Sequence, residues 1–589
     1  MSLRAPKSVV PWLCLASILI LFLFHLARLR PVDHFGRYHD DTLYFSSAKA
    51  LAEGRGYIVP SLPGTPPNKY PVLYPWLLSW IWRASPSFPA NVAPAVWMTA
   101  AFACWFLIAA FYLLRSLVGV GDRLALLIVS LCAFQPHFLF FSGAVMSDIP
   151  FMAFALSAAV VADSAMRRDG RSVLVAAAGI LSGLSVMTRF LGIAVVAGIF
   201  ATAVYRRAYR QAAVFSLVAV LFLLAVLWPS GSYSLHERPE MASVRPGPGW
   251  RQTWFFYTNY LEFRKVCVPR LGVLLPLVVT NLFLFLKGPS SDYLFSVLQL
   301  RGSRMGMALC VVLTVFVLMG IVRQARGQEW KPIHFLFLFN AAITLLWHYP
   351  LTDRFLLLFL PLFYSGLWVE GRRVALLVLD NLHPGRPAAQ KVLAAVLGVV
   401  LATLVMTAVW SYPDGYRPVF RSLATQRAAL LPFKRQAYEW LRQNTDANTR
   451  IVAHEDANLF LYTGRQAVRP IAFSSEWFYT GDTRVLKRDL AHITDTAQYV
   501  GARFWVTAED DFQLELGRPM IQARMAQLKS VLPLVFYSEE NKVQVYDLSC
   551  VLQPDRAECR VAVPILFPDL PDAGPQQNCS SSAHLLRLC

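Results

Sequence analysis

Charged residues are scarce in this chain of 589 residues. They make up 15% of it, whereas hydrophobic residues make up 56%. Soluble proteins average about a quarter charged residues, so this composition excludes an ordinary soluble domain. Apolar runs of about 20 residues, long enough to cross a bilayer, recur along the first two thirds of the chain. The sequence therefore predicts a mainly α, polytopic transmembrane helical bundle.

Acidic residues are also few: 36 Asp and Glu stand against 55 Lys and Arg, which gives a net charge of +19. A nucleic-acid-binding protein would gather its basic residues on a soluble surface. Here many of them lie in short loops between apolar runs, as expected of loops that stay in the cytoplasm. We therefore expect no nucleic-acid partner and assign five basic groups to the cytoplasmic side: Arg115 with Arg123, 167–171, 206–210, Arg323 with Arg326, and 372–373.

The predicted spans follow from these runs and loops. They lie at roughly 9–29, 92–115, 123–142, 150–166, 172–188, 190–205, 210–230, 305–323, 333–349, 353–370 and 391–411. The first is read as an uncleaved anchor, since no small-residue cleavage site follows it. The loops 30–91, 142–149, 231–304 and 350–352 then lie outside. We expect the apolar segment 271–287 to be an interfacial or re-entrant helix bent by Pro276.

The composition changes after the last predicted span. Residues 1–411 form the predicted membrane domain, and residues 412–589 alternate helix-like and strand-like segments. PFKRQAYEWLRQNT indicates an amphipathic helix, and TRIVAHE, RFWVTAED, PLVFYSEE and KVQVYDLS indicate strands. We predict an extracytoplasmic α/β domain with a cysteine-containing tail.

Cysteines are few, and four of the nine crowd the last 40 residues. These four are Cys550, Cys559, Cys579 and Cys589. Two disulfides in an oxidising compartment would suit such a loop-rich tail, and three pairings are possible. Free thiols and a metal site are the alternatives, although the spacing fits no usual zinc motif.

An acidic pair, Asp40 and Asp41, stands out on the first predicted outer loop. Ionisable residues at a membrane are costly and usually mark a functional site. The following residues, LYFSSAKALAEG, are typical of a short helix on the membrane surface. One carboxylate could be a general base toward an acceptor hydroxyl, and the other could bind a metal or orient the acceptor. The alternative is that both cap this helix.

A third carboxylate and three cations are predicted on the same face. Asp148, in SDIPF, lies at the outer end of a span, where it could equally be a helix cap. Lys69, Arg189 and Arg354 lie at predicted outer boundaries and could simply extend to the interface. Together they would form a charged clamp for a lipid-linked phosphate.

These residues carry a resemblance to a known superfamily. HDDTLY, KYPVLYPWLLSW, SDIPF and RFLLLFLP, in this order, resemble the GT-C integral-membrane glycosyltransferases, as does the span pattern over 9–411. Bacterial relatives of protein O-mannosyltransferases and of the lipid A aminoarabinose transferase are the most similar members. The tail phrase AYEWLRQNTDANTRIVAHEDANLFLYTGRQAV resembles the extracytoplasmic domain of some of them.

The resemblance implies an inverting transfer of one sugar from a polyprenyl-phosphate donor to an acceptor hydroxyl. By its match to the Asp-Glu pair of this family, Asp40 is the expected base, while Asp41 stands where many members have Glu. Lys69 matches a lysine that contacts the donor phosphate, although Tyr70 replaces a proline beside it. Asp148 matches the acidic residue of the second loop, and Arg189 and Arg354 match basic positions. Tyr44, Tyr70 and His348 are further possible substrate contacts.

Several points stay open at this stage. A divalent metal (Mg or Mn) is optional, with Asp41 and Asp148 as its ligands if one is used. The acceptor could be a lipid, a glycan or a protein, and a bacterial inner membrane is the expected location. A secondary transporter is the main alternative, but no internal repeat is evident and the informative charges are not mid-membrane. An envelope-assembly scaffold is the third possibility.

Overall fold

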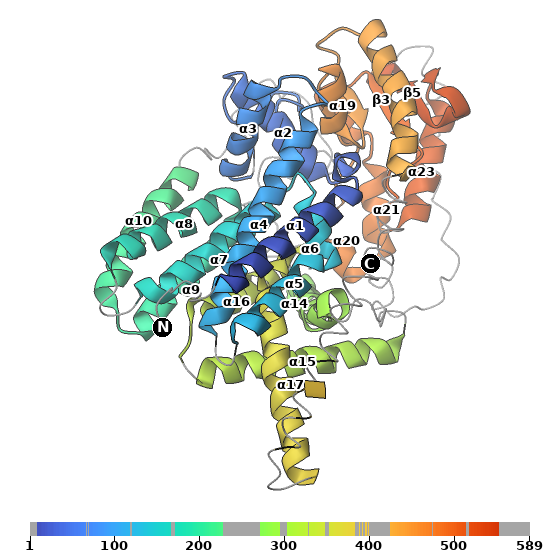
Figure 1. The fold of residues 1–589 in the computed structure, drawn as a ribbon. Coiled ribbons are helices and arrows are strands. Elements are labelled where there is room, and N and C mark those ends of the chain that lie inside the picture. Colours follow the sequence, from blue (N-terminus) through green and yellow to red (C-terminus); the bar gives the residue numbers. More distant parts are fainter. Residues whose placement is uncertain are drawn as a thin grey trace.

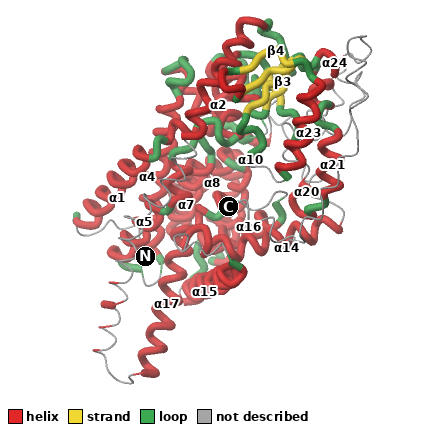
Figure 2. Tube along the Cα trace, turned by 90° about the vertical axis from the view of Figure 1, so that its right-hand side faces the viewer, coloured by secondary structure: helices red, strands yellow, loops and turns green. Residues whose placement is uncertain are grey.

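The structure is a computed structural model that describes most of the chain. It describes residues 9–65, 68, 70–117, 120–166, 171–227, 271–294, 303–327, 329–347, 353–382, 425–473, 475–513 and 517–552, with isolated helical residues between 388 and 399. The first part is helical and forms a bundle, and a small sheet lies beyond α2 and α3 at one end of it (Figures 1 and 2). α17 extends from the other end (Figure 1).

The membrane part consists of helices joined by short turns. Up to α9 the elements are α1 (Val10–Arg28), η1 (Pro31–His34), α2 (His39–Ala52), α3 (Leu73–Ala84), α4 (Val92–Ser116), α5 (Asp122–Phe134), α6 (Pro136–Ser142), α7 (Asp148–Ala165), α8 (Ser172–Thr188), η2 (Phe190–Gly192) and α9 (Ile193–Tyr205). Then follow α10 (Tyr209–Leu227), α14 (Leu271–Gly288), η4 (Pro289–Leu294), α15 (Arg304–Gly327), α16 (Pro332–Leu345), η7 (Asp353–Phe355), η8 (Leu357–Phe359) and α17 (Leu360–Leu382).

Most predicted spans are found as apolar helices. Within the described ranges, α1, α4, α7, α15 and the segment Leu274–Leu294 are long and apolar enough to cross a membrane. The predicted span 123–142 is broken instead, because α5 and α6 meet at 65° before Pro136. A proline in the first turn of α6 costs nothing there, since that N–H has no intrahelical partner. The predicted span 391–411 lies almost wholly outside the described residues.

Two further segments differ from expectation or extend it. Residues 353–370 are not one helix: two 3-10 turns precede α17, whose second residue is Pro361. The segment Leu274–Leu294, which runs from α14 into η4, passes the length and hydropathy requirements for a span, and its end reaches the break between α5 and α6. There the Gln135 side-chain amide donates to the Asp292 carbonyl at 2.9 Å. Its interfacial or re-entrant placement stays a prediction.

α7 is the centre of the bundle. Fifteen of its 18 residues are buried, including both of its aspartates. It packs against α8 and α4, and α9 and α16 also contact it. A helix so apolar on all sides is expected only where neighbours enclose it. The two ends of α7 are therefore fixed points of the fold.

The first predicted outer loop, 30–91, contains two helices rather than an open loop. α2 confirms the predicted short helix after the acidic pair. α3 buries Tyr74 and Leu78 and leaves Trp76 and Trp80 exposed. Indole rings favour the membrane–water boundary, so this face suits the head-group region.

The C-terminal part is the predicted α/β domain. A helix over 425–444 precedes β1 (Ile451–Ala453), α19 (Asp456–Thr463), β2 (Ala467–Val468), α20 (Ser475–Thr480), α21 (Thr483–Ala491), α22 (Asp495–Val500), β3 (Phe504–Ala508), α23 (Arg518–Val531), β4 (Leu534–Tyr537), η9 (Glu539–Asn541), β5 (Val543–Asp547) and α24 (Ser549–Leu552). The strand order is β2-β1-β3-β5-β4; β1 is parallel to β2 and β3, and β5 is antiparallel to β3 and β4. All four predicted strands are present.

Of the four C-terminal cysteines predicted to form disulfides, the structure describes only one. Cys550 is disulfide-bonded. Cys559, Cys579 and Cys589 lie outside the described residues. Cys14, Cys104, Cys132 and Cys310 are free thiols.

This packing predicts a difference between two glycines of α15. A Cβ on Gly320 would overlap the Gly366 carbonyl oxygen of α17, whereas one on Gly327 would meet nothing within 4 Å. We expect Gly320→Ala to separate α15 from α17 and to lower the unfolding temperature in detergent by several degrees. Gly327→Ala, the matched control, should be neutral or stabilising by up to about 1 kcal/mol. Equal unfolding temperatures for the two variants would contradict this packing.

Candidate functional site

Asp40 is in the first turn of α2 and is held from two sides. The Tyr70 hydroxyl donates to its Oδ1 at 2.5 Å, and Arg354 Nη1 lies 3.3 Å from its Oδ2. The side chain of Asp40 is 17% exposed, so the carboxylate is oriented but still accessible. Its partners come from the Lys-Tyr-Pro turn and from η7, far away in the sequence. The predicted proximity of Asp40, Tyr70 and Arg354 is found in the structure.

Asp148 and Arg189 form a second, tighter pair. Asp148 is the first residue of α7, and Arg189 follows the last residue of α8. The Arg189 Nη1 atom lies 2.6 Å from Asp148 Oδ2, and the two side chains are 15% and 4% exposed. The extended backbone of Arg189 (φ −149°, ψ 139°) ends α8 at this point.

Aromatic side chains join the two pairs into one site. The guanidinium carbons of Arg189 and Arg354 each lie 5.8 Å from the centre of the Phe355 ring. The Tyr44 hydroxyl is 2.8 Å from Ser147 Oγ, and the Tyr44 and Tyr70 rings are 4.8 Å apart. A ring shared by two cations helps to offset their mutual repulsion. The segments around residues 40, 70, 148, 189 and 354 therefore meet at one end of α7.

Asp41 has a different environment from Asp40. Its Oδ2 accepts the backbone N–H of Gly36 at 2.9 Å and that of Tyr38 at 3.4 Å. The side chain is buried, and burial raises the pKa of Asp41 well above its usual range, against the opposing effect of Arg427. These contacts favour the capping alternative for Asp41.

Two predicted site residues, Lys69 and His348, lie outside the described residues. The turn on either side of Lys69 is nevertheless anchored. Asn68 donates to Ser47 Oγ of α2 at 2.7 Å and accepts the Tyr70 N–H at 2.9 Å. The Tyr57 hydroxyl donates to the Tyr70 carbonyl at 2.8 Å. Tyr70 is therefore fixed against α2, although the sequence left the shape of this turn in doubt.

The carboxylates proposed as optional metal ligands each have one oxygen engaged. Asp41 Oδ2 accepts two backbone N–H groups, and Asp148 Oδ2 pairs with the Arg189 guanidinium. Among the described residues, no group of three or more His, Cys, Asp or Glu side chains is arranged to hold a metal.

Phe355 and Ser147 were not identified from the sequence. Each is the chain neighbour of a predicted residue, Arg354 or Asp148, but neither carries a signal of its own. An apolar ring in an apolar run and a serine beside a helix start are common features. They lie in the site only because segments that are distant in the sequence come together there in the fold.

The two adjacent aspartates should behave differently when removed. We expect Asp41→Ala to lower the free energy of unfolding by about 1–2 kcal/mol, because two N–H groups lose their acceptor. Asp40→Ala is the neighbouring control and should cost less, since its ion pair is partly exposed. Thermal unfolding in detergent measures both changes. A larger loss for Asp40→Ala would contradict the capping role of Asp41.

Comparison with known proteins supports the fold. No protein-family model and no curated protein matches the sequence. Among solved structures, the oligosaccharyltransferase of Archaeoglobus fulgidus in complex with zinc and sulfate is similar with a TM-score of 0.51 and 13% identity; the match covers 89% of this chain and 72% of that one.

Two further structures are similar at lower scores. ArnT from Cupriavidus metallidurans bound to undecaprenyl phosphate has a TM-score of 0.48 and 14% identity, over 92% of this chain and 98% of that one. The oligosaccharyltransferase AglB from Archaeoglobus fulgidus, in complex with an inhibitory peptide and a dolichol-phosphate, has a TM-score of 0.47 and 14% identity, over 89% and 74%. With its helical bundle and C-terminal α/β domain, the chain shares the fold of the Archaeoglobus fulgidus oligosaccharyltransferase determined with zinc and sulfate.

Proposed function

We propose that this protein is a membrane glycosyltransferase that moves a monosaccharide from a polyprenyl-phosphate donor to an acceptor hydroxyl, with inversion. The observation that carries the proposal is Asp40. Its carboxylate is oriented by Tyr70 and Arg354, remains accessible, and lies in one cluster with Arg189 on Phe355. The motif resemblance and the shared fold support the same chemistry.

The reaction is a direct displacement. The acceptor oxygen attacks the anomeric carbon while the Asp40 carboxylate takes the hydroxyl proton. The bond from the anomeric carbon to the phosphate oxygen breaks, and its electron pair leaves with the lipid phosphate. Attack on the face opposite the leaving group inverts the configuration. Tyr70 holds the carboxylate in position for the proton transfer.

The two arginines are suited to the leaving phosphate. A guanidinium has five N–H donors, and a single carboxylate oxygen uses only some of them. Arg189 and Arg354 each face one carboxylate and share the Phe355 ring, so a phosphate near that ring would meet both. Charge developing on the phosphate in the transition state would be stabilised there. Lys69 completes the clamp in this proposal.

The site is proposed to lie on the extracytoplasmic face of a bacterial inner membrane. Arg206 and Lys331 reach Asp163, near the other end of α7, and Lys331 also donates to the Ser116 carbonyl at the end of α4. Basic residues at that end favour a cytoplasmic position for it. The C-terminal domain then lies outside, together with the site.

The base role predicts the effect of a near-isosteric change. In a deletion strain complemented with Asp40→Asn, we expect transfer to fall by about 10²-fold or more, because a general base contributes that much. Mass spectrometry of envelope lipids, glycans and proteins compares this strain with the deletion strain and the wild type. Membrane levels of the variant should be unchanged. Wild-type amounts of product with Asp40→Asn would overturn the assignment and favour a scaffold.

The phosphate clamp can be tested without knowing the sugar. The double variant Arg189→Gln/Asp148→Asn removes both charges, so no buried ion is left unpaired. We expect it to bind undecaprenyl phosphate about 10-fold or more weakly, as charge-assisted hydrogen bonds contribute about 1.5–3 kcal/mol. The control is Arg115→Gln/Asp122→Asn, which removes an ion pair of 2.7 Å at the other end of the bundle. Equal affinity for both double variants would contradict the clamp.

A further inference from the structure

The loop that leads into α2 passes close to the C-terminal domain. After η1 the chain turns at Gly36, whose φ of +81° is a conformation that L side chains rarely adopt. Three residues later α2 begins at His39, and Asp40 follows. The position of Asp40 therefore depends on how residues 35–39 are held.

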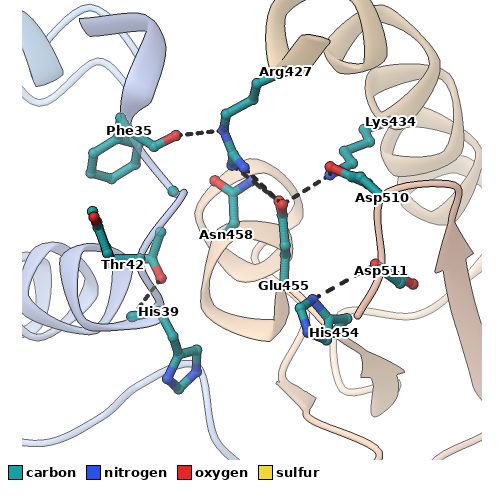
Figure 3. Close-up of polar contacts among 12 residues, drawn as sticks. Phe35, His39, Thr42, Arg427, Lys434, His454, Glu455, Asn458, Asp510 and Asp511 are labelled. Atoms are coloured by element: carbon teal, nitrogen blue, oxygen red, sulfur yellow. Dashed lines mark hydrogen bonds and ion pairs between the residues drawn. The ribbon is translucent and has the colours of Figure 1, made fainter. Parts of the chain in front are cut away.

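Arg427 of the C-terminal part holds the start of this loop. Its Nε donates to the Phe35 carbonyl at 2.8 Å, and its two terminal nitrogens contact the two oxygens of Glu455 at 2.9 and 3.2 Å (Figure 3). A Cβ on Gly36 would overlap Arg427 Nη2. Glycine at this position is thus what lets the guanidinium approach the loop so closely.

Glu455 is itself fixed from its other side. Lys434 Nζ lies 2.9 Å from Glu455 Oε1 and 2.8 Å from Asp510 Oδ2, and Asn458 donates to Glu455 Oε2 at 2.9 Å (Figure 3). Burial acts against its charge, but Arg427 and Lys434 outweigh burial and lower the pKa of Glu455. The carboxylate is a charged, fully engaged anchor.

The next residue, Asp456, holds the other end of the loop. Its Oδ1 lies 2.8 Å from His39 Nε2, and its side chain is fully buried. The same oxygen accepts the Ala457 N–H at 2.7 Å, which fixes the carboxylate at the start of α19. His39 is the first residue of α2 and the chain neighbour of Asp40.

We infer that the C-terminal domain positions the proposed base, Asp40, against Tyr70 and Arg354. Glu455 does so through Arg427, which holds the Phe35 carbonyl. Asp456 does so through His39. Two adjacent carboxylates of one domain thus hold both ends of the segment that leads to the base. None of these four groups touches the reacting atoms; they are positioning residues. The inference rests on the proposed function, in which a displacement of about 1 Å can cost about 10²-fold in rate.

His39 is the residue to change, because its loss leaves the Arg427 network intact. We expect His39→Ala to lower transfer in the complemented strain about 10-fold or more, while undecaprenyl phosphate affinity stays within twofold. His39→Gln retains an N–H donor for Asp456 and should restore transfer to within about threefold of the wild type. The matched control is His492→Ala, which removes a His–Asp pair of 2.9 Å elsewhere in the C-terminal domain.

A second measurement does not depend on activity. Hydrogen exchange of the peptide 34–45 in the purified full-length protein should be faster in His39→Ala than in wild type, His39→Gln or His492→Ala. Unchanged exchange of this peptide in His39→Ala would overturn the inference, whatever happens to transfer. If wild type shows no transfer, the proposed function fails, and the exchange result still decides whether Asp456 holds α2. If Asp40→Asn is inactive but His39→Ala is fully active, only the positioning role fails.

Discussion

Pairing of arginine with aspartate where the helices end is the interaction on which the site depends. Asp148 and Arg189 are both largely buried, and removing water from such charges is expensive unless each has a partner. Their contact fixes the beginning of α7 against the end of α8. Phe355 then brings Arg354, and with it Asp40, to the same place.

The residue patterns of the sequence pointed to several residues of the candidate site but not to the contacts between them. Asp40, Asp148, Arg189 and Arg354 were predictable because ionisable residues at the ends of apolar runs are rare and conspicuous. The role of Asp41 was not, since a capping carboxylate and a catalytic one look alike in a sequence. Adjacent residues lie about 100° apart around a helix, so the two aspartates necessarily face different surroundings. Only the structure shows which of them faces Tyr70.

The contacts between the C-terminal domain and the loop before α2 could not be predicted from the sequence, for a different reason. Arg427 and Phe35 are separated by almost 400 residues, and neither belongs to a recognisable motif. The strands and the long helix of that domain follow from local periodicity, which a single sequence reveals. Its orientation on the loop before α2 depends on long-range pairs such as His39 with Asp456, which local periodicity does not encode.

The two ends of α7 stabilise their aspartates in different ways. Asp163, near the C-terminal end, faces the negative end of the helix dipole and is held by two cations, Arg206 and Lys331. Asp148 is the first residue, where the dipole already favours a carboxylate, and Arg189 is its paired cation. The helix dipole and Arg189 thus stabilise Asp148 together. Arg189 and Arg354 both lie against Phe355, where the proposed reaction has the leaving phosphate.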